Sequence, residues 1–200
     1  MAKSVIAALA AVVVAATPGS PAAEVLAASE NALVISHRAE IGADARAVWA
    51  TLIEPRQWWS AEHTWSGNAA NLALEPRAGG CFCETLPAAD TAPAGSAERL
   101  RVIHVQPGRL LRLSGALGPL QEEGLAGTLS ITLEPLAEGR TAMRWTYTVS
   151  GYRAGAGGLE VLAQPVDNVL AQQGAGLVAV AQAAISRVPA APVDTGRESH

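Results

Sequence analysis

Lysine is nearly absent from this chain of 200 residues, where Lys3 is the sole lysine among 14 basic side chains. No two basic residues stand next to each other, and the formal net charge is −4. Nucleic-acid-binding domains cluster Lys and Arg on one face to contact phosphates. We therefore expect no nucleic-acid partner.

Motifs of the common enzyme and cofactor classes are also absent. The sequence has no HExxH metal motif, no glycine-rich phosphate loop, no dinucleotide fingerprint and no recognisable Ser-His-Asp arrangement. Its two cysteines, Cys81 and Cys83, have one residue between them, which excludes the CxxC spacing of thiol oxidoreductases. We expect neither a cofactor nor a metal.

The N-terminus is apolar and uncharged after Lys3. An uninterrupted apolar run extends from Val5 to Ala16, and small residues follow it. This order is typical of a secretory signal peptide, and the run is shorter than the ~20 residues that span a membrane. We predict a signal peptide over residues 1–23, cleaved between Ala16 and Ala23. The protein is then periplasmic or secreted, with no stable membrane insertion after cleavage.

The next segments show first the period of a strand and then that of a helix. Residues 24–32 form a polar lead-in. Apolar and polar residues alternate over residues 33–41, which predicts a strand. Asp44 is a candidate N-cap for an amphipathic helix that ends before Pro55.

Six further strands are predicted, separated by turn residues, at 71–76, 79–86, 98–106, 109–115, 127–135 and 141–151. The last two alternate most clearly, which is typical of half-buried antiparallel strands. Residues 98–106 do not alternate cleanly, so the direction of Arg101 stays open.

A long helix is predicted from Pro165 to about Arg187, because an apolar stripe recurs at helical spacing there. Gly174 and Gly176 interrupt the stripe and indicate a kink or a close approach to the sheet. Residues 189–200 are predicted to be a disordered tail. The helix must bury its stripe against a sheet. The expected fold is α+β, a curved antiparallel sheet of six to seven strands wrapped around the C-terminal helix.

The segments "IGADARAVWATLIEPRQWW" and "LEPRAGGCFCE", with the long C-terminal helix, resemble the START-like helix-grip (SRPBCC) superfamily. The resemblance is nearest to its polyketide-cyclase and chaperone-activator-related branch and covers roughly residues 33–187. It implies a START-like ligand-binding domain over residues 33–188, with a mostly apolar pocket between helix and sheet. The superfamily includes carriers, receptors and cyclases, so the fold does not decide among these functions.

The stretch "WWSAEHTWSG" at residues 58–67 holds Trp58, Trp59 and Trp65 around His63. Adjacent residues do not share a helix face, so at most one of Trp58 and Trp59 points inward. An indole lining a pocket offers a flat apolar wall and an N–H that orients a ligand. Packing at the end of the sheet is the alternative, expected for at least one of them.

His63 is the leading candidate for proton transfer, and Glu84 is its candidate partner. A general base needs an orienting group within hydrogen-bond reach. A hydrogen-bonding role in the scaffold is the alternative for His63.

Cys81 and Cys83 fall on one face of a strand, where alternate Cα atoms lie ~6.6–6.8 Å apart. That separation is the upper limit for a disulfide. Two thiols lining the pocket are the favoured interpretation. A disulfide, which export favours, requires the strand to bend. A metal site with His63 lacks the usual four ligands.

Trp145 and Tyr147 share the apolar face of their strand and should meet the terminal helix. Core packing is expected for both, and Tyr147 can offer its hydroxyl to the pocket.

Two functions remain open. The favoured one is an exported protein that binds a small hydrophobic or aromatic molecule, without catalysis. Its pocket is predicted to involve Trp58, Trp59, His63, Trp65, Cys81, Cys83, Trp145 and Tyr147. The alternative is an enzyme of the cyclase or dehydratase type that uses the same pocket, with His63 or Glu84 moving a proton. A chaperone-regulating module, implied by the family branch alone, fits poorly with export.

Overall fold

The computed structural model describes residues 22–153 and 157–186. Most of the predicted signal peptide, residues 1–21, and all of the predicted tail lie outside these ranges. The strands and helices are β1 (Ala22–Ser29), β2 (Ala32–Ile41), α1 (Ala45–Leu52), β3 (Leu72–Leu74), β4 (Cys81–Leu86), β5 (Gly95–Gln106), β6 (Leu110–Ser114), β7 (Ala126–Pro135), β8 (Thr141–Ser150) and α2 (Ala163–Ser186). Short 3-10 turns connect them: η1 (Pro55–Gln57), η2 (Ala61–His63), η3 (Ala69–Asn71), η4 (Gly118–Gln121), η5 (Ala137–Gly139) and η6 (Leu159–Leu162).

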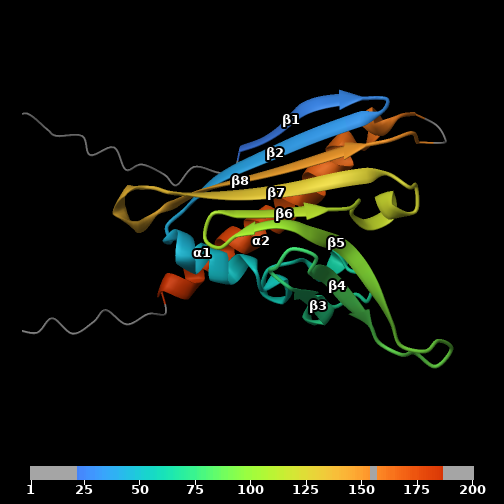
Figure 1. Ribbon diagram of the computed structural model, residues 1–200, viewed down its shortest axis with the longest axis horizontal. Helices are drawn as coiled ribbons and strands as arrows, with labels where there is room; N and C mark the ends of the chain where they lie inside the picture. The colour runs from blue at the N-terminus through green and yellow to red at the C-terminus, as the bar shows by residue number, and fades with distance from the viewer. Residues whose placement is uncertain (1–21, 154–156, 187–200) are drawn as a thin grey trace, which may run out of the picture.

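The strands of the described residues form one antiparallel eight-stranded sheet in the order β1-β2-β8-β7-β6-β5-β4-β3. Helix α2 crosses the sheet and packs on β1, β2 and α1 (Figure 1). The predicted fold class is therefore confirmed: an α+β helix-grip arrangement. The sheet has one more strand than predicted because residues expected as a polar lead-in form β1, which pairs with β2 at the sheet edge.

The strand that was expected first, β2, and the helix after it, α1, follow the predicted pattern. β2 pairs with β8 along its whole length. Helix α1 begins after Asp44, whose Oδ1 accepts the Ala47 N–H at 2.8 Å. No helix in the described part of the chain is both long and apolar enough to cross a membrane.

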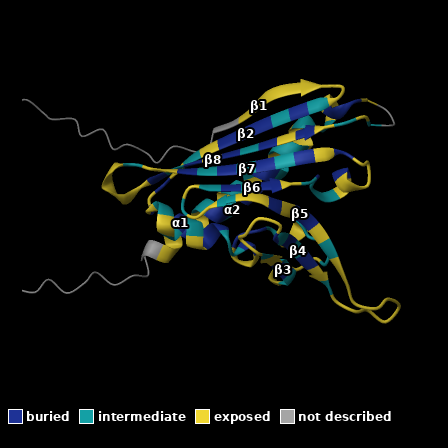
Figure 2. Ribbon diagram, viewed as in Figure 1, coloured by how far each residue is buried: buried dark blue, intermediate teal, exposed yellow. Residues whose placement is uncertain are grey.

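The core lies between the sheet and α2. Alternate residues of β8 are buried, so that Met143, Trp145, Tyr147 and Val149 all contribute to it. Figure 2 shows the same alternation along β7. His37 is buried on this side of β2, with Nε2 2.9 Å from Asp167 Oδ1 of α2.

Strand β5 carries two irregularities in its pairing. Phe82 pairs with Leu100 whereas Cys83 pairs with Glu98, which leaves Arg99 as an extra residue. A second bulge lies between Val102 and His104. A bulge bends a strand and redirects its side chains. Arg99 and Leu100 are consequently both buried although they are consecutive.

Gly176 marks a close approach, as the sequence predicts, but to a different partner. A β-carbon at this position would clash with the main-chain carbonyl oxygen of Trp58. A side chain nearby bridges the same elements, since Gln173 Oε1 accepts the Ser60 N–H at 2.8 Å. Helix α2 therefore contacts the backbone of the Trp-rich segment here rather than the sheet. At Gly174, by contrast, no neighbouring group of the described residues lies within 4 Å of an added β-carbon.

Candidate functional site

A cavity of about 540 Å³ lies between the sheet and the first half of α2. Pockets of ~300–1,000 Å³ hold small organic molecules. Its aliphatic wall comes from the η4 region, η6 and α2: Leu117, Leu120, Leu162, Val166, Val169 and Leu170. The charged side chains in its lining are Glu62, Arg99, Glu123 and Arg153. The cavity thus combines an apolar wall with a small set of polar groups.

The two adjacent indoles of the Trp-rich segment have different positions. Trp59 lines the cavity and is 5% exposed, and its Nε1–H donates to the His63 carbonyl at 3.1 Å. Trp58 is not among the cavity-lining residues. It packs edge-on against Trp145 with ring centroids 5.8 Å apart, and its Nε1–H donates to the Thr51 carbonyl. One indole is therefore a wall of the cavity and the other is core.

Trp65 lines the cavity but is 45% exposed. An exposed indole at a cavity lining marks the rim, where the aromatic ring meets solvent.

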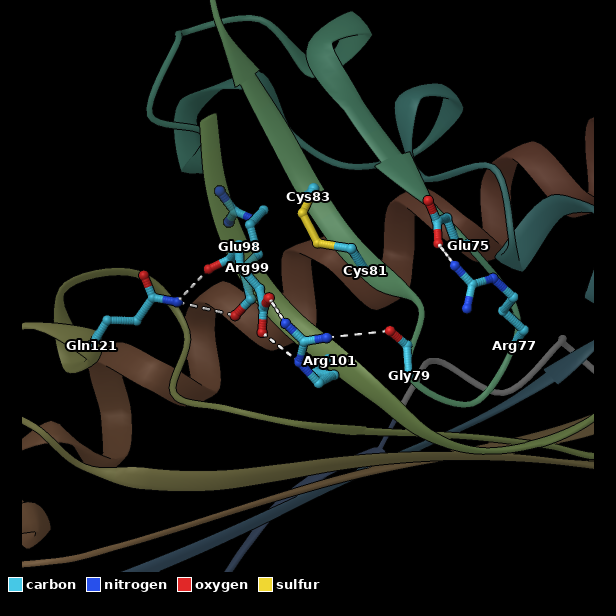
Figure 3. Close-up of a disulfide and its surroundings, with 9 residues drawn as sticks. All are labelled: Glu75, Arg77, Gly79, Cys81, Cys83, Glu98, Arg99, Arg101 and Gln121. Carbon is cyan, nitrogen blue, oxygen red and sulfur yellow. Dashed lines mark hydrogen bonds and ion pairs between the residues drawn. A yellow bond between two sulfur atoms is a disulfide. The ribbon is translucent and has the colours of Figure 1, made fainter. Parts of the chain in front are cut away.

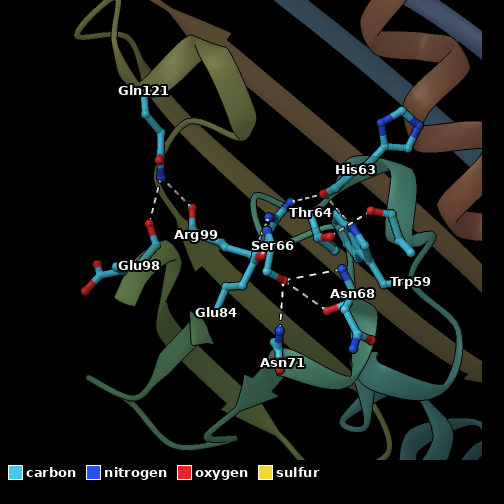
Figure 4. Close-up of polar contacts among 11 residues, drawn as sticks. Trp59, His63, Thr64, Ser66, Asn68, Asn71, Glu84, Glu98, Arg99 and Gln121 are labelled. Carbon is cyan, nitrogen blue, oxygen red and sulfur yellow. Dashed lines mark hydrogen bonds and ion pairs between the residues drawn. The ribbon is translucent and has the colours of Figure 1, made fainter. Parts of the chain in front are cut away.

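Glu84 and Arg99 form an ion pair that contacts the Trp-rich segment. Arg99 NH1 donates to Glu84 Oε2 at 2.7 Å, and NH2 donates to the His63 carbonyl at 2.7 Å. Glu84 Oε1 accepts the Ser66 N–H at 2.6 Å. Figure 4 shows Arg99 between Glu84 and His63. The exposed fractions are 0% for Glu84 and 4% for Arg99, so both charges are removed from solvent.

Arg99 lines the cavity, whereas Glu84 does not. The guanidinium also lies over the Trp59 ring, 5.2 Å from its centroid, in cation–π geometry. Within residues 22–153 and 157–186, Arg99 Nε has no hydrogen-bond partner. A buried donor without a partner costs free energy unless something else accepts from it.

Opposing effects set the charge of the pair. Burial alone raises the pKa of the Glu84 carboxyl, but hydrogen bonds from Ser66, Trp65 and Arg99 outweigh it and bring the pKa below its ordinary value. Burial lowers the pKa of the Arg99 guanidinium, and the neighbouring carboxylate opposes that change. Arginine stays protonated in proteins. The pair is thus a carboxylate bound to a guanidinium, with zero net charge.

His63 lines the cavity, and among the described residues no carboxylate pairs with its ring. Its Nε2 lies 2.8 Å from Gln172 Oε1 on α2. The Gln172 amide nitrogen in turn contacts Ser60 Oγ and Glu62 Oε2 at 3.3 and 3.4 Å. The side chains of His63 and Glu84 make hydrogen bonds to different partners. Arg99 connects the two residues, because it donates to the Glu84 carboxylate and to the main-chain carbonyl of His63. The side chain of His63 fastens the Trp-rich segment to α2.

Tyr147 belongs to the cavity lining on the sheet side, and its side chain is fully buried. Its Oη accepts the Leu117 N–H at 2.8 Å. Burial raises the pKa of this phenol to about 12, although the Leu117 N–H acts in the other direction. The hydroxyl is therefore protonated at neutral pH, and in the described residues no acceptor for its proton accompanies the Leu117 contact. Trp145, its neighbour on the same strand face, is core and lies outside the cavity lining.

Glu123 and Arg153 form an ion pair in the cavity lining, with Arg153 Nε 2.7 Å from Glu123 Oε2. Their side chains are 30% and 21% exposed, so this pair stands toward solvent. Glu62 lines the cavity as well and is exposed. The lining charges outside the Arg99 pair are thus near the solvent.

Cys81 and Cys83 form a disulfide, and the prediction of two thiols lining the pocket is wrong. Their Cα atoms lie 5.3 Å apart, within the ordinary disulfide range and shorter than a regular strand gives. The bulge at Arg99 lies directly opposite in β5, and the β4–β5 pairing shifts between Phe82 and Cys83. Figure 3 shows the disulfide on β4 beside Arg99 and Arg101. Neither cysteine lines the cavity, and the described residues hold no cluster of three or more His, Cys, Asp or Glu suited to a metal.

The sequence pattern does not single out Arg99, which is the most buried cation of the site. Two features of the sequence bear on it: the broken alternation of residues 98–106 and a charged Glu84 on the buried face of β4 with Phe82. Arg101, whose direction the sequence leaves open, is exposed and pairs with Glu98. The wall from Pro165 to Leu170 is also part of the predicted helix stripe, but only the fold shows which turns of it face a cavity.

No family model matches this chain, and no curated protein matches it in sequence. Solved structures do resemble it. The protein of unknown function SA2116 from Staphylococcus aureus gives a TM-score of 0.54 at 11% identity, covering 77% of this chain and 97% of that one. Mll3558 from Rhizobium loti gives 0.52 at 14% identity, covering 74% and 96%. A Rhodobacter sphaeroides protein gives 0.50 at 17% identity, covering 82% and 99%. This likeness shows the fold alone, a sheet with a long C-terminal helix.

Proposed function

We propose that this chain is an exported START-like (SRPBCC) domain that binds a small hydrophobic or aromatic molecule in the cavity between sheet and α2. The cavity itself is the observation that carries the proposal. Its volume of about 540 Å³ exceeds that of a packing defect, and its wall is mainly aliphatic and aromatic. The large buried core around it means that the space is not left by a poorly packed fold.

Export rests on two independent features. The apolar N-terminal run has the order of a signal peptide. The Cys81–Cys83 disulfide is of a kind that persists in oxidising compartments outside the cytosol.

Fluorescence titration with the apolar dye phenylnaphthylamine tests the binding proposal. We expect saturable binding with one site per chain, quenching the Trp59 and Trp65 emission. Val169→Trp fills the cavity, because Val169 lines it, and should abolish binding. Val161→Trp is the matched control: Val161 is 52% exposed, lies outside the lining and should leave binding unchanged. Equal binding by both variants would place the dye elsewhere and overturn the proposal.

The enzymatic alternative has one observation in its favour, a histidine in the cavity lining. In the part of the chain that the structure describes, the His63 ring pairs with the Gln172 amide oxygen at Nε2 and with no carboxylate. Glu84 is committed to Arg99 and Ser66. Ligand binding without catalysis therefore accounts for more of the site. Turnover of a cyclisable polyketide that is lost in His63→Ala but kept in Gln172→Ala would favour the enzyme instead.

A further inference from the structure

The Cys81–Cys83 disulfide links two residues that the sheet already holds together. Both cysteines belong to β4, with one residue between them, and the backbone of β4 pairs with β3 on one side and with β5 on the other. Stabilisation by a disulfide grows with the length of the loop that it closes. Because this bond closes so short a loop and joins no separate elements, cross-linking gives it only a minor structural role.

The disulfide lies on the solvent side of β4. The residues that alternate with the cysteines, Phe82 and Glu84, are 4% and 0% exposed, whereas Cys81 and Cys83 are only half-buried. The β5 residues paired with the two cysteines are exposed, and so is the β3 residue paired with Cys83. The two cysteine side chains therefore stand on the face of the strand that a thiolate of another molecule can approach.

Two oppositely charged residues of β5 stand beside the cysteines. In the register of the sheet, Arg101 pairs with Cys81 and Glu98 pairs with Cys83 (Figure 3). The Arg101 guanidinium donates to the Glu98 carboxylate and to the Gly79 carbonyl, so it extends toward the chain that leads into Cys81. A cation stabilises a neighbouring thiolate, and a carboxylate destabilises one. Cys81 is therefore the better leaving sulfur, and Cys83 is the sulfur for an incoming thiolate to attack.

We propose that Cys81 and Cys83 form a thiol–disulfide exchange site that oxidises cysteine pairs in peptides. A peptide thiolate attacks Cys83 Sγ, so that a mixed disulfide forms, the Cys81–Cys83 bond breaks and Cys81 leaves as a thiolate. The second peptide thiolate attacks the peptide sulfur of the mixed disulfide and releases Cys83 as a thiolate. The peptide thus loses two electrons and the cysteine pair gains them, while the protons pass through solvent.

A small-molecule disulfide such as oxidised glutathione restores the Cys81–Cys83 bond by the reverse exchange, and is itself reduced to two thiols. The proposed activity does not depend on ligand binding, because neither cysteine lines the cavity. Failure of the dye to bind would therefore leave this proposal standing, and failure of the exchange would leave the ligand proposal standing.

Incubation of the unreduced protein with a short synthetic peptide that contains two cysteines tests the proposal. The peptide should be oxidised one-to-one with the protein, about tenfold faster than by oxidised glutathione at the same concentration, because a stabilised thiolate leaves faster. Cys81→Ser/Cys83→Ser is the control and should leave the peptide reduced. This variant should fold, since so short a loop adds little stability. A peptide that stays reduced, or that reacts no faster than with oxidised glutathione, overturns the proposal.

Alkylation of the reduced protein tests the roles of the two cysteines. At neutral pH, iodoacetamide should react with Cys81 faster than with Cys83. Arg101→Gln should slow the reaction of Cys81 at neutral pH but not in alkali, where every thiol is ionised. Arg140→Gln is the matched control, because Arg140 is also exposed and paired with a glutamate, Glu40, and it should leave the pH profile unchanged. Equal rates for the two cysteines, or an unchanged profile in Arg101→Gln, would contradict Cys81 as the leaving sulfur.

Discussion

Gly176 of α2 lies against the main-chain carbonyl oxygen of Trp58, with no room between them for a β-carbon. On the same side of the helix, Gln172 contacts His63, and Gln173 accepts the Ser60 N–H. Helix α2 therefore holds the Trp-rich segment in place, and this segment supplies one wall of the cavity. The stretch "WWSAEHTWSG" is therefore a structural part of the cavity wall.

Gly176→Ala should destabilise the protein, because the added methyl group must displace the Trp58 carbonyl. Overpacking of this kind costs ~1–3 kcal/mol. Gly174→Ala is the matched control two residues away, where the added methyl has no neighbour within 4 Å in residues 22–153 and 157–186. That change should stabilise the helix by up to about 1 kcal/mol. Urea unfolding of both variants measures the difference in unfolding free energy. If Gly176→Ala is as stable as Gly174→Ala, the close contact between Gly176 and Trp58 is contradicted.

Glu84 should make stability fall in acid. Its pKa is lowered in the folded protein, so its contribution is complete above the ordinary glutamate pKa of ~4.3 and is lost as the pH falls through the folded value. Glu84→Gln removes the charge. The difference in unfolding free energy between wild type and this variant should be largest near neutrality and should shrink below about pH 4.

Glu75→Gln provides the control for that pH series. Glu75 pairs with Arg77 at the surface, with side chains 56% and 70% exposed. Exposed pairs contribute ~0–1 kcal/mol, so this variant should follow the wild type at every pH. A constant gap for Glu84→Gln from neutrality into acid would mean that Glu84 is not held ionised by Arg99.

Tyr147 should limit stability in alkali. Its pKa is raised to about 12, so its contribution is complete below the unfolded value of ~10 and is lost as the pH rises through the folded value. Phenolate absorbance should show a late titration step that Tyr147→Phe abolishes. Tyr152→Phe, at a position 76% exposed, should retain it. If Tyr152→Phe lost the late step instead, the step would belong to Tyr152, and the account of Tyr147 would be contradicted.

The disulfide should leave no free thiol. Both cysteines of the chain take part in it, so thiol titration of the denatured, unreduced protein should find none, and reduction should release both. The double variant Cys81→Ser/Cys83→Ser should lose ~1–2 kcal/mol, since the closed loop is very short. Reactive thiols in the unreduced sample would restore the prediction of two free cysteines.

The sequence predicts the fold well because periodicity reports on burial. β2, α1, β7, β8 and α2 all lie where alternation or helical spacing indicates them. β1 is not predicted, because residues 24–29 show no clean alternation and lie at the sheet edge. Only pairing with β2 makes them a strand.

The site is less predictable because its residues come together through irregularities. The shifted β4–β5 register both buries Arg99 and brings Cys81 and Cys83 within disulfide distance. A bulge depends on how two strands pair, which the pattern of either strand alone does not contain. His63, Trp59 and Trp65 are recognisable from their clustering, but their separate positions depend on the contact between α2 and Trp58.

The most direct test of ligand binding in this cavity is the set of contacts that a bound probe makes in solution. With methyl-labelled Leu and Val, intermolecular NOEs from phenylnaphthylamine should reach Leu117, Leu120 and Val169, which line the cavity. They should be absent for Val25 and Leu26, the exposed apolar residues of β1. NOEs confined to Val25 and Leu26 would show surface adsorption and would contradict a ligand site between the sheet and α2.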